Sequence, residues 1–417
     1  MSIVNDSEFS RSEVLLGAVT IMTGASKRRS APPVPALPRA PGRYDTPVPV
    51  RSRRVSTSSQ LVRALHSRRP HDIVIADGVY DHAGGVVAGA GHRIYAERPP
   101  TRGKPHVELR FGISFDAHAH FRVHGIAFRI TDRGRGAFDG DAFVGAIVNG
   151  FNTSSVGGVV TDCVVDGGLL LTQGLLLGCP RGAVIKRCVI SRCTDEGIRA
   201  SDNQFGSSAE IAAISDIRAF QIFRPRRGES DGTAEAGVWV GHKVTQGVQR
   251  IAVHDTGWMG LWTGNACRRT TFSDLTLDNF SGTAADGSPA SFGIYLEKYN
   301  GVRGDQGAGN TFERFAIGPA VDVGIVNEWD HGEAGQQASN GSVFRNGRIH
   351  SRRVGIFLDQ GTRDPAIDNV WFRGQGDVAV VDCTNSPPAT GPDSSSARIG
   401  TLRVSGGTKR LRYGGHS

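Results

Sequence analysis

Several sequence motifs that would directly identify a catalytic or metal-binding chemistry are missing from this sequence. Its 417 residues include 6 Cys and 3 Met, with no paired C-x-x-C, no H-E-x-x-H and no P-loop. The first two absences argue against zinc-ribbon and zincin sites, and the third argues against P-loop nucleotide chemistry. No run of about 18 apolar residues occurs, so we expect no membrane span.

Helical periodicity is equally scarce, because no segment after Leu65 repeats its apolar residues every 3.6 positions. Glycine, in contrast, is abundant: 56 residues, without the G-X-Y period of collagen. That content suits a fold that turns every few residues. The formal net charge of +8 mildly favours a polyanionic partner, although such a composition is also typical of GC-rich genomes. We expect a polysaccharide, acidic or neutral, and no nucleic acid.

Three segments follow one another along the chain. Residues 1–25 end in an apolar stretch of signal-peptide length, preceded by a segment that resembles a twin-arginine export signal in which Ser12 replaces the second arginine. Residues 26–54 are rich in proline and arginine and predict an extended linker. Residues 55–417 should form the folded domain. The expected localisation is therefore secreted or in the cell envelope.

A short helix should open the domain. Thr57 and Gln60 are spaced as in a capping box, and apolar residues follow at helical spacing up to Leu65. The strand-like segment 73–75 comes next and ends in a turn. A helix in this place would cover the open end of a repeat protein, whose terminal strands otherwise expose core and edge.

Two short patterns alternate through the rest of the chain and carry the fold prediction. In the first, Gly or Ala precedes a branched aliphatic residue that starts a strand-like stretch. Its members are Ala146-Ile147, Gly168-Leu169, Gly197-Ile198, Gly237-Val238, Gly260-Leu261, Gly293-Ile294, Gly324-Ile325, Gly355-Ile356 and Ala379-Val380. In the second, two apolar residues stand five apart. Its members are Phe121/Ile126, Val160/Val165, Ile185/Ile190, Val248/Val253, Phe272/Leu277, Phe312/Ile317, Phe344/Ile349, Ile367/Phe372 and Ile399/Val404.

Coils of roughly 22 residues or more, with insertions in their loops, would produce this alternation, each strand stacking on its counterpart in the next coil. A β-propeller is the alternative fold, but it would need four strands in each blade and a more constant repeat period. The sequence therefore predicts an all-β fold, a single-stranded right-handed parallel β-helix with a short N-terminal capping helix.

With this strand ladder and the segment 73–80 (IVIADGVY), the chain resembles the pectin-lyase-like superfamily of β-helix proteins. The resemblance implies a polysaccharide lyase, a glycoside hydrolase, a uronate epimerase, or a non-catalytic tailspike or adhesin. The polygalacturonase branch is disfavoured, because its Asn-Thr-Asp and Asp-Asp motifs are absent and Gly241-His242-Lys243 matches only part of its Gly-His-Gly motif.

Strand alternation decides which side chains of the first pattern face outward. The residue after Gly should face the core, so the next residue, and the one two positions further, should face out. The first outward column reads Arg199, Trp239, Trp262, Tyr295, Val326 and Phe357. The second reads Ser201, Gly241, Gly264, Glu297, Glu328 and Asp359.

Glu297, Glu328 and Asp359 recur in one register on three successive coils and are the candidate catalytic residues. Carboxylates one strand spacing apart, about 4.8 Å, raise one another's pKa, as a general acid requires. Glu328 lies in the middle and should be the general acid, with either neighbour as the ionised partner. Hydrolysis would need no cofactor, whereas Ca²⁺ held by the same acids would serve a lyase. A solvated acidic stripe is the third interpretation.

A sugar-binding surface is expected beside these acids. Trp239, Trp262 and Tyr295 form an aromatic ladder on which sugar rings would stack, although the same rings could simply pack beneath a loop. The loops after Glu297 and Glu328 are long, and binding residues often lie on loops held by a rigid scaffold. The further candidate substrate-binding residues are Lys243, Lys298, Trp329 and Asp330.

Two other groups of residues are weaker candidates. Asp195, Glu196 and Asp202 precede the aromatic ladder and could bind a metal ion, although we assign no metal site. Cys179 and Cys193 could form a disulfide in an exported protein, and the sequence leaves this open.

The favoured function is an exported carbohydrate-active enzyme that cleaves a polysaccharide in the outward groove, as a glycoside hydrolase with paired carboxylates. A Ca²⁺-dependent polysaccharide lyase or uronate epimerase is one alternative, in which Lys298, Lys243 or Arg199 would take the proton. A non-catalytic adhesin or fibre protein is the other. The sugar, its linkage, endo or exo action and the oligomeric state do not follow from the sequence.

Overall fold

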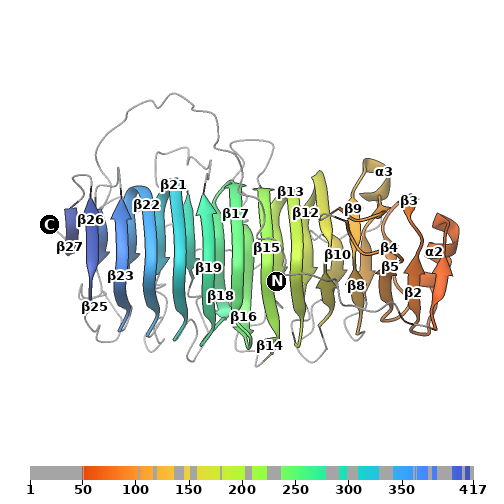
Figure 1. The fold of residues 1–417 in the computed structure, drawn as a ribbon, viewed down its shortest axis with the longest axis horizontal. Coiled ribbons are helices and arrows are strands. Elements are labelled where there is room, and N and C mark those ends of the chain that lie inside the picture. Colours follow the sequence, from red (N-terminus) through yellow and green to blue (C-terminus); the bar gives the residue numbers. More distant parts are fainter. Residues whose placement is uncertain are drawn as a thin grey trace, which may run out of the picture.

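The computed structural model is a parallel β-helix whose strands stack side by side along one long axis, from helix α2 (Ser58–Leu65) to strand β27 (Lys409–Tyr413) (Figure 1). The structure describes residues 49, 51–101, 104–115, 120–135, 145–150, 157–178, 181–201, 209–222, 236–278, 291–297, 309–327, 341–359, 362, 364–373, 378–382, 397–405 and 409–413. The named strands pair in parallel, which confirms the predicted fold class and excludes a propeller.

Three strand ladders run the length of the β-helix. The first consists of β1 (Arg53–Val55), β2 (Asp72–Ile75), β5 (Arg93–Ala96), β8 (Arg122–His124), β11 (Val159–Thr161) and the first halves of β13 (Val184–Ala200), β15 (Ala213–Ile222), β17 (Val248–Thr256), β19 (Thr271–Asp278), β21 (Thr311–Asn327), β22 (Val343–Leu358) and β23 (Ala366–Arg373), with β25 (Arg398–Ile399) at the end. The second consists of β3 (Gly78–Tyr80), β6 (Val107–Leu109), β9 (Ile126–Arg129), the first part of β12 (Val164–Leu177), the continuations of β13, β15, β17, β19, β21, β22 and β23, and β26 (Leu402–Ser405).

The third ladder carries the Gly-aliphatic pattern. It consists of β4 (Val86–Val87), β7 (Ile113–Phe115), β10 (Gly145–Asn149), the ends of β12 and β13, β16 (Ala236–Val244), β18 (Met259–Ala266), β20 (Phe292–Leu296), the ends of β21 and β22, β24 (Val378–Asp382) and β27. The short strand β14 (Glu210–Ile211) pairs with the end of β16.

The glycine in this pattern is required because the third ladder lies close against the opposite wall of the β-helix. A Cβ on Gly324 would lie 2.5 Å from the carbonyl oxygen of Gly355 and 2.5 Å from the Ile349 side chain. A Cβ on Gly355 would meet Phe372 at 2.4 Å. All three distances are too short for any side chain. The following aliphatic residue is buried in the core, as alternation predicts.

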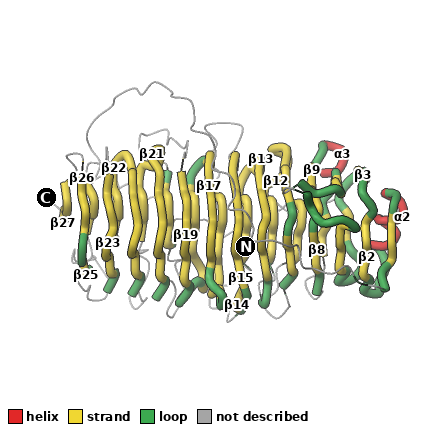
Figure 2. Tube along the Cα trace, viewed as in Figure 1, coloured by secondary structure: helices red, strands yellow, loops and turns green. Residues whose placement is uncertain are grey.

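The predicted cap is also present. Gln60 donates its backbone N–H to the Thr57 hydroxyl at 3.2 Å, and its side-chain oxygen accepts from the backbone N–H of Ser56 at 2.9 Å. The apolar face of α2 buries Leu61 and Leu65 at the end of the core. Among the described residues, Figure 2 shows helix at α2 and at the short α3 (Asp132–Arg135) and nowhere else. Within the described residues, no helix is long and apolar enough to cross a membrane.

A column of left-handed residues separates the first ladder from the second. It runs Asp162, Arg187, Asp216, Arg250, Asp274, Arg314, Asn346 and Asn369, with φ between 49° and 59°. A left-handed residue other than glycine costs roughly 1 kcal/mol, and here side-chain pairing between coils offsets that cost. Arg187 donates two hydrogen bonds of 2.6 Å to Asp162, and Arg314 donates two of 2.8 and 3.1 Å to Asp274. At the end of the column, the Asn369 side-chain amide donates a hydrogen bond of 2.8 Å to Asn346.

Two members of the predicted repeats were assigned to the wrong residues. Leu175, after Gly174, and not Leu169, occupies the third ladder in register with Ile198. Leu169 instead has a φ of 61° and lies at a turn within β12. Similarly, Val123 and Phe128 pair with Val160 and Val165, where Phe121 and Ile126 were predicted. Both errors are slips between neighbouring apolar residues.

Candidate functional site

The outer face of the third ladder carries two columns of side chains. The first predicted column is confirmed, because Arg199, Trp239, Trp262, Tyr295, Val326 and Phe357 pair in sequence on adjacent coils. Another outward column, different from the second predicted one, runs beside it through Gln173, Glu196, Ala236, Met259, Phe292, Val323, Val354 and Val378. From Ala236 onward the members of the two columns other than Trp239 and Trp262 belong to one apolar cluster outside the core, and Trp262 packs against it. The polar groups of the two columns are thus concentrated at the end nearer the N-terminus.

The aromatic ladder is a real stack at that polar end. The rings of Trp239 and Trp262 lie 4.2 Å apart and 10° from parallel, and the Arg199 guanidinium lies 4.0 Å from the centre of the Trp239 ring. Tyr295 follows in register on the next coil. Trp239 is only 6% exposed. The indole N–H groups of Trp239 and Trp262 are buried and meet no acceptor among the described residues.

Two adjacent carboxylates, Asp195 and Glu196, lie beside this stack. The Gln173 amide donates to Asp195 at 3.2 Å and to Glu196 at 2.7 Å, so that one nitrogen holds both groups. Arg199 lies 3.5 Å from the other oxygen of Glu196. All four side chains are buried, and Glu196 is 2% exposed. The result is a compact acid pair on the outside of the β-helix wall.

Their environment separates the two acids from ordinary surface carboxylates. Burial, and then the charge of Asp195, raises the pKa of Glu196 well above its usual value. Burial lowers the pKa of Arg199, against the opposing pull of the two acids. The raised pKa favours the protonated form of Glu196 beside a second carboxyl group. A carboxyl group in that form suits general acid chemistry.

Two of the three predicted catalytic residues lie in described parts of the chain. Glu297 and Asp359 follow directly on the ends of β20 and β22, where their backbone N–H groups bond to Thr263 and Asn327. A Cβ on Gly264 would lie 3.4 Å from the Glu297 carboxylate and 3.5 Å from the Trp262 indole nitrogen, so that acid lies beside the aromatic stack. Asp359 is buried and Glu297 is partly exposed. Glu328 lies outside the described residues.

The other predicted substrate-binding residues are placed in part. Lys243 forms an ion pair of 2.7 Å with Glu210 across β14 and β16. Lys298, Trp329 and Asp330 lie outside the described residues. The roles given to all of these residues stay predictions.

Neither a metal site nor a disulfide is found in the described ranges. There, no three His, Cys, Asp or Glu side chains gather as a metal site would need. Asp202, a member of the alternative metal group, lies outside those ranges. Cys193 is a buried free thiol, and Cys179 lies outside the described residues. Burial raises the pKa of that thiol.

The sequence places Asp195 and Glu196 side by side but indicates for them only an alternative metal site. Gln173 is the residue that the sequence does not connect to this pair. It lies opposite Glu196 because Gly174–Leu175, and not Gly168–Leu169, is the member of the repeat in β12. Two acids immediately before the Gly197–Ile198 member could have been recognised, since the residue before that glycine faces outward on every later coil.

No protein-family model and no curated protein matches the chain. Among solved structures, the Agl-KA catalytic domain gives a TM-score of 0.46 at 12% identity, over 91% of this chain and 70% of that one. The catalytic domain of a GH87 α-1,3-glucanase in complex with tetrasaccharides gives 0.42 at 13% identity, over 88% and 70%. An alginate lyase from a Paenibacillus species gives 0.32 at 11% identity, over 86% and 98%. At such low similarity, the activity has to be argued from this chain's own residues.

Proposed function

We propose that this chain is an exported carbohydrate-active enzyme of the pectin-lyase-like kind, a glycoside hydrolase that acts on the outer face of the third ladder. One observation carries the proposal: a buried carboxyl pair, Asp195 and Glu196, bridged by Gln173 and placed beside stacked tryptophans. Hydrolysis of a glycosidic bond needs one protonated and one ionised carboxyl group, and we assign these roles to Glu196 and Asp195.

Each polar group then has a role. Glu196, whose pKa is raised by burial, donates a proton to the oxygen of the bond that breaks. Asp195 is the ionised partner that stabilises positive charge on the sugar or activates water. Gln173 fixes the two carboxyl groups relative to each other, and Arg199 supplies a compensating positive charge at 3.5 Å.

The tryptophans support a sugar substrate. Trp239 and Trp262 carry buried N–H donors without an acceptor in the described part of the structure. Burying such a donor costs free energy unless a ligand or a water molecule accepts its hydrogen bond. Sugar hydroxyl groups are acceptors of this kind, and the ring faces suit the apolar side of a sugar. Because Glu196 is 2% exposed, the reaction requires that substrate access opens at this face.

Glu297, Glu328 and Asp359 are the second candidate set of catalytic acids. They would act further along the same face, with Tyr295, Lys298, Trp329 and Asp330 as substrate-binding residues. The position of the Glu297 carboxylate near the Trp262 indole supports this second set.

A polysaccharide panel, screened with and without a chelator, tests the proposal. On a substrate that the wild type cleaves, Glu196→Gln keeps the side-chain shape and removes the proton, so we expect activity to fall by about 10³-fold with substrate binding retained. Glu297→Gln, Glu328→Gln and Asp359→Asn are the matched comparison. Loss of activity in these variants with a fully active Glu196→Gln would move the chemistry to the second set.

Two outcomes would replace the proposed reaction. An unsaturated product, with activity abolished by the chelator, would indicate a Ca²⁺-dependent lyase. Binding of a polysaccharide without any product, unaffected by neutralising all of these acids, would indicate an adhesin.

A further inference from the structure

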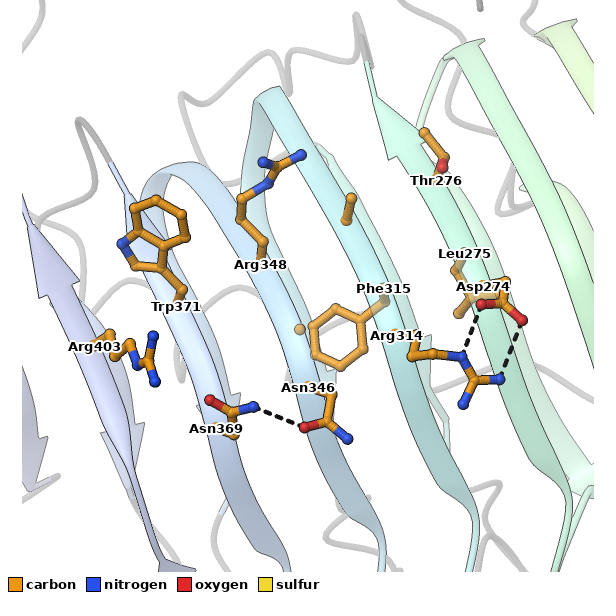
Figure 3. Close-up of a pocket in the computed structure, with 12 residues that line it drawn as sticks. Asp274, Leu275, Thr276, Arg314, Phe315, Asn346, Arg348, Asn369, Trp371 and Arg403 are labelled. Carbon is orange, nitrogen blue, oxygen red and sulfur yellow. Dashed lines mark hydrogen bonds and ion pairs between the residues drawn. The ribbon is translucent and has the colours of Figure 1, made fainter. Parts of the chain in front are cut away.

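A concave surface lies on the outer side of the second ladder, across β19, β21, β22, β23 and β26 (Figure 3). We call it the arginine groove. Its outward column runs Thr276, Ala316, Arg348, Trp371 and Arg403 on successive coils. The left-handed column contributes Asp274, Arg314, Asn346 and Asn369. The depression has a volume of about 500 Å³.

Glycine and small residues create this depression. A Cβ on Gly347 would lie 2.1 Å from the ring of Phe315, so the ring occupies the place that a side chain would take. Phe315 is buried and forms part of the floor of the groove. At one end, the lining residues Thr276 and Ala316 have small side chains that fill little of the depression. The hollow is therefore built by the residues of these coils themselves.

One aromatic ring stands in this groove open to solvent. Trp371 is 40% exposed, and the other large exposed hydrophobic residues in the described ranges are the aliphatic Val79 and Val87. Amides lie beside it in the left-handed column, where Asn369 donates to Asn346 at 2.8 Å, and the Arg373 guanidinium lies 5.9 Å from the centre of the Trp371 ring. An exposed ring beside exposed amides is a surface that stacks and hydrogen-bonds a ligand at once.

The positive charge of the groove is not neutralised. Arg314 is bonded to Asp274 and Glu313, but Arg348 and Arg403 are exposed and have no carboxylate partner in the described part of the chain. These two arginines flank Trp371 on the adjacent coils, in register with it. Arginine forks pair bidentately with carboxylate and sulfate groups.

We propose that the arginine groove is a second glycan site, which binds an acidic polysaccharide. A sugar ring stacks on Trp371, and its carboxylate or sulfate groups pair with Arg348 and Arg403. Successive nucleic acid bases would need successive aromatic side chains, whereas the coils on both sides of Trp371 present arginine. The site does not depend on the proposed catalytic pair, which lies on the third ladder.

Calorimetric titration of the full chain tests this site. The probes are oligogalacturonate for carboxylate, dextran sulfate for sulfate, neutral dextran, and an oligothymidylate. Trp371→Ala should weaken binding of the acidic probe about tenfold, and Arg348→Gln combined with Arg403→Gln should weaken it at least as much and reduce its salt dependence. Which acidic probe binds more tightly identifies the anionic group.

Arg345→Gln is the matched control, since Arg345 is also an exposed arginine of β22 but pairs with Glu313 and does not line the groove. It should bind within twofold of the wild type, and Glu196→Gln should too, even if the proposed catalysis fails. The proposal is overturned if no acidic probe binds, or if neutral dextran binds equally well and the arginine variants are unchanged. Tighter oligothymidylate binding, lost in the same variants, would also overturn it in favour of nucleic acid.

Discussion

Trp239 and Trp371 both point away from the core of the same β-helix, yet one is 6% exposed and the other 40%. Trp239 lies in an outer column of the third ladder, buried between the Trp262 ring and the Arg199 guanidinium. Trp371 lies on the second ladder between two exposed arginines. Strand alternation fixes the direction of a side chain. Whether that side chain meets water depends on what packs against it from outside.

The largest expected effect comes from removing one ring on each face. Trp239→Ala should lower the free energy of unfolding by about 3–5 kcal/mol, because a buried tryptophan leaves a cavity. Trp371→Ala should change it by roughly 0.5 kcal/mol or less. Denaturant unfolding followed by circular dichroism gives both values. Equal losses in the two variants would show that the two faces do not differ in packing.

The left-handed column offers a second comparison, between a buried and an exposed aspartate. Burial by itself would raise the pKa of Asp162. Hydrogen bonds from Arg187 and His124 have the larger combined effect and hold that pKa below its usual value. Arg314 similarly lowers the pKa of Asp274, where both partners are exposed. Asp162→Asn should cost about 3 kcal/mol and Asp274→Asn less than about 1 kcal/mol. Because the pKa of Asp162 is depressed, its contribution should be present at neutral pH and be lost as the pH falls below about 3.8.

The acid pair predicts a pH dependence of opposite sign. Since the pKa of Glu196 is raised in the folded state, its contribution to stability is complete below the unfolded value of about 4.5 and is lost as the pH rises through the folded value. Each unit of that shift corresponds to about 1.4 kcal/mol. Glu196→Gln should therefore flatten the decline in stability above pH 4.5. A wild type and a variant with parallel stability profiles would mean that Glu196 is ionised in the folded protein.

Much of the fold could be predicted because its signals are local and repeated. The Gly-aliphatic pattern reflects an interior too narrow for a Cβ at positions such as Gly324 and Gly355, so it recurs wherever the third ladder passes. The errors arose where that pattern was ambiguous. In β12 both Gly168–Leu169 and Gly174–Leu175 fit, and only strand pairing shows that the latter pair is in register.

The candidate site was harder to predict, for a physical reason. Outward direction was read correctly for Trp239 and Arg199, but their burial depends on contacts between coils and from outside, which no local pattern contains. The arginine groove was not anticipated, since it depends on the missing side chain of Gly347 and on residues from five strands. The trio with Glu328 at its centre stays a prediction, as does export through residues 1–25.

The most direct test of this account is a crystal structure of Glu196→Gln in complex with an oligosaccharide that the wild type cleaves. We expect a sugar ring against Trp239 or Trp262, with its glycosidic oxygen within hydrogen-bonding reach of the substituted side chain at position 196 and of Asp195. A sugar bound across Glu297 and Asp359 alone, or only in the arginine groove, would contradict the assignment of catalysis to the Asp195–Glu196 pair.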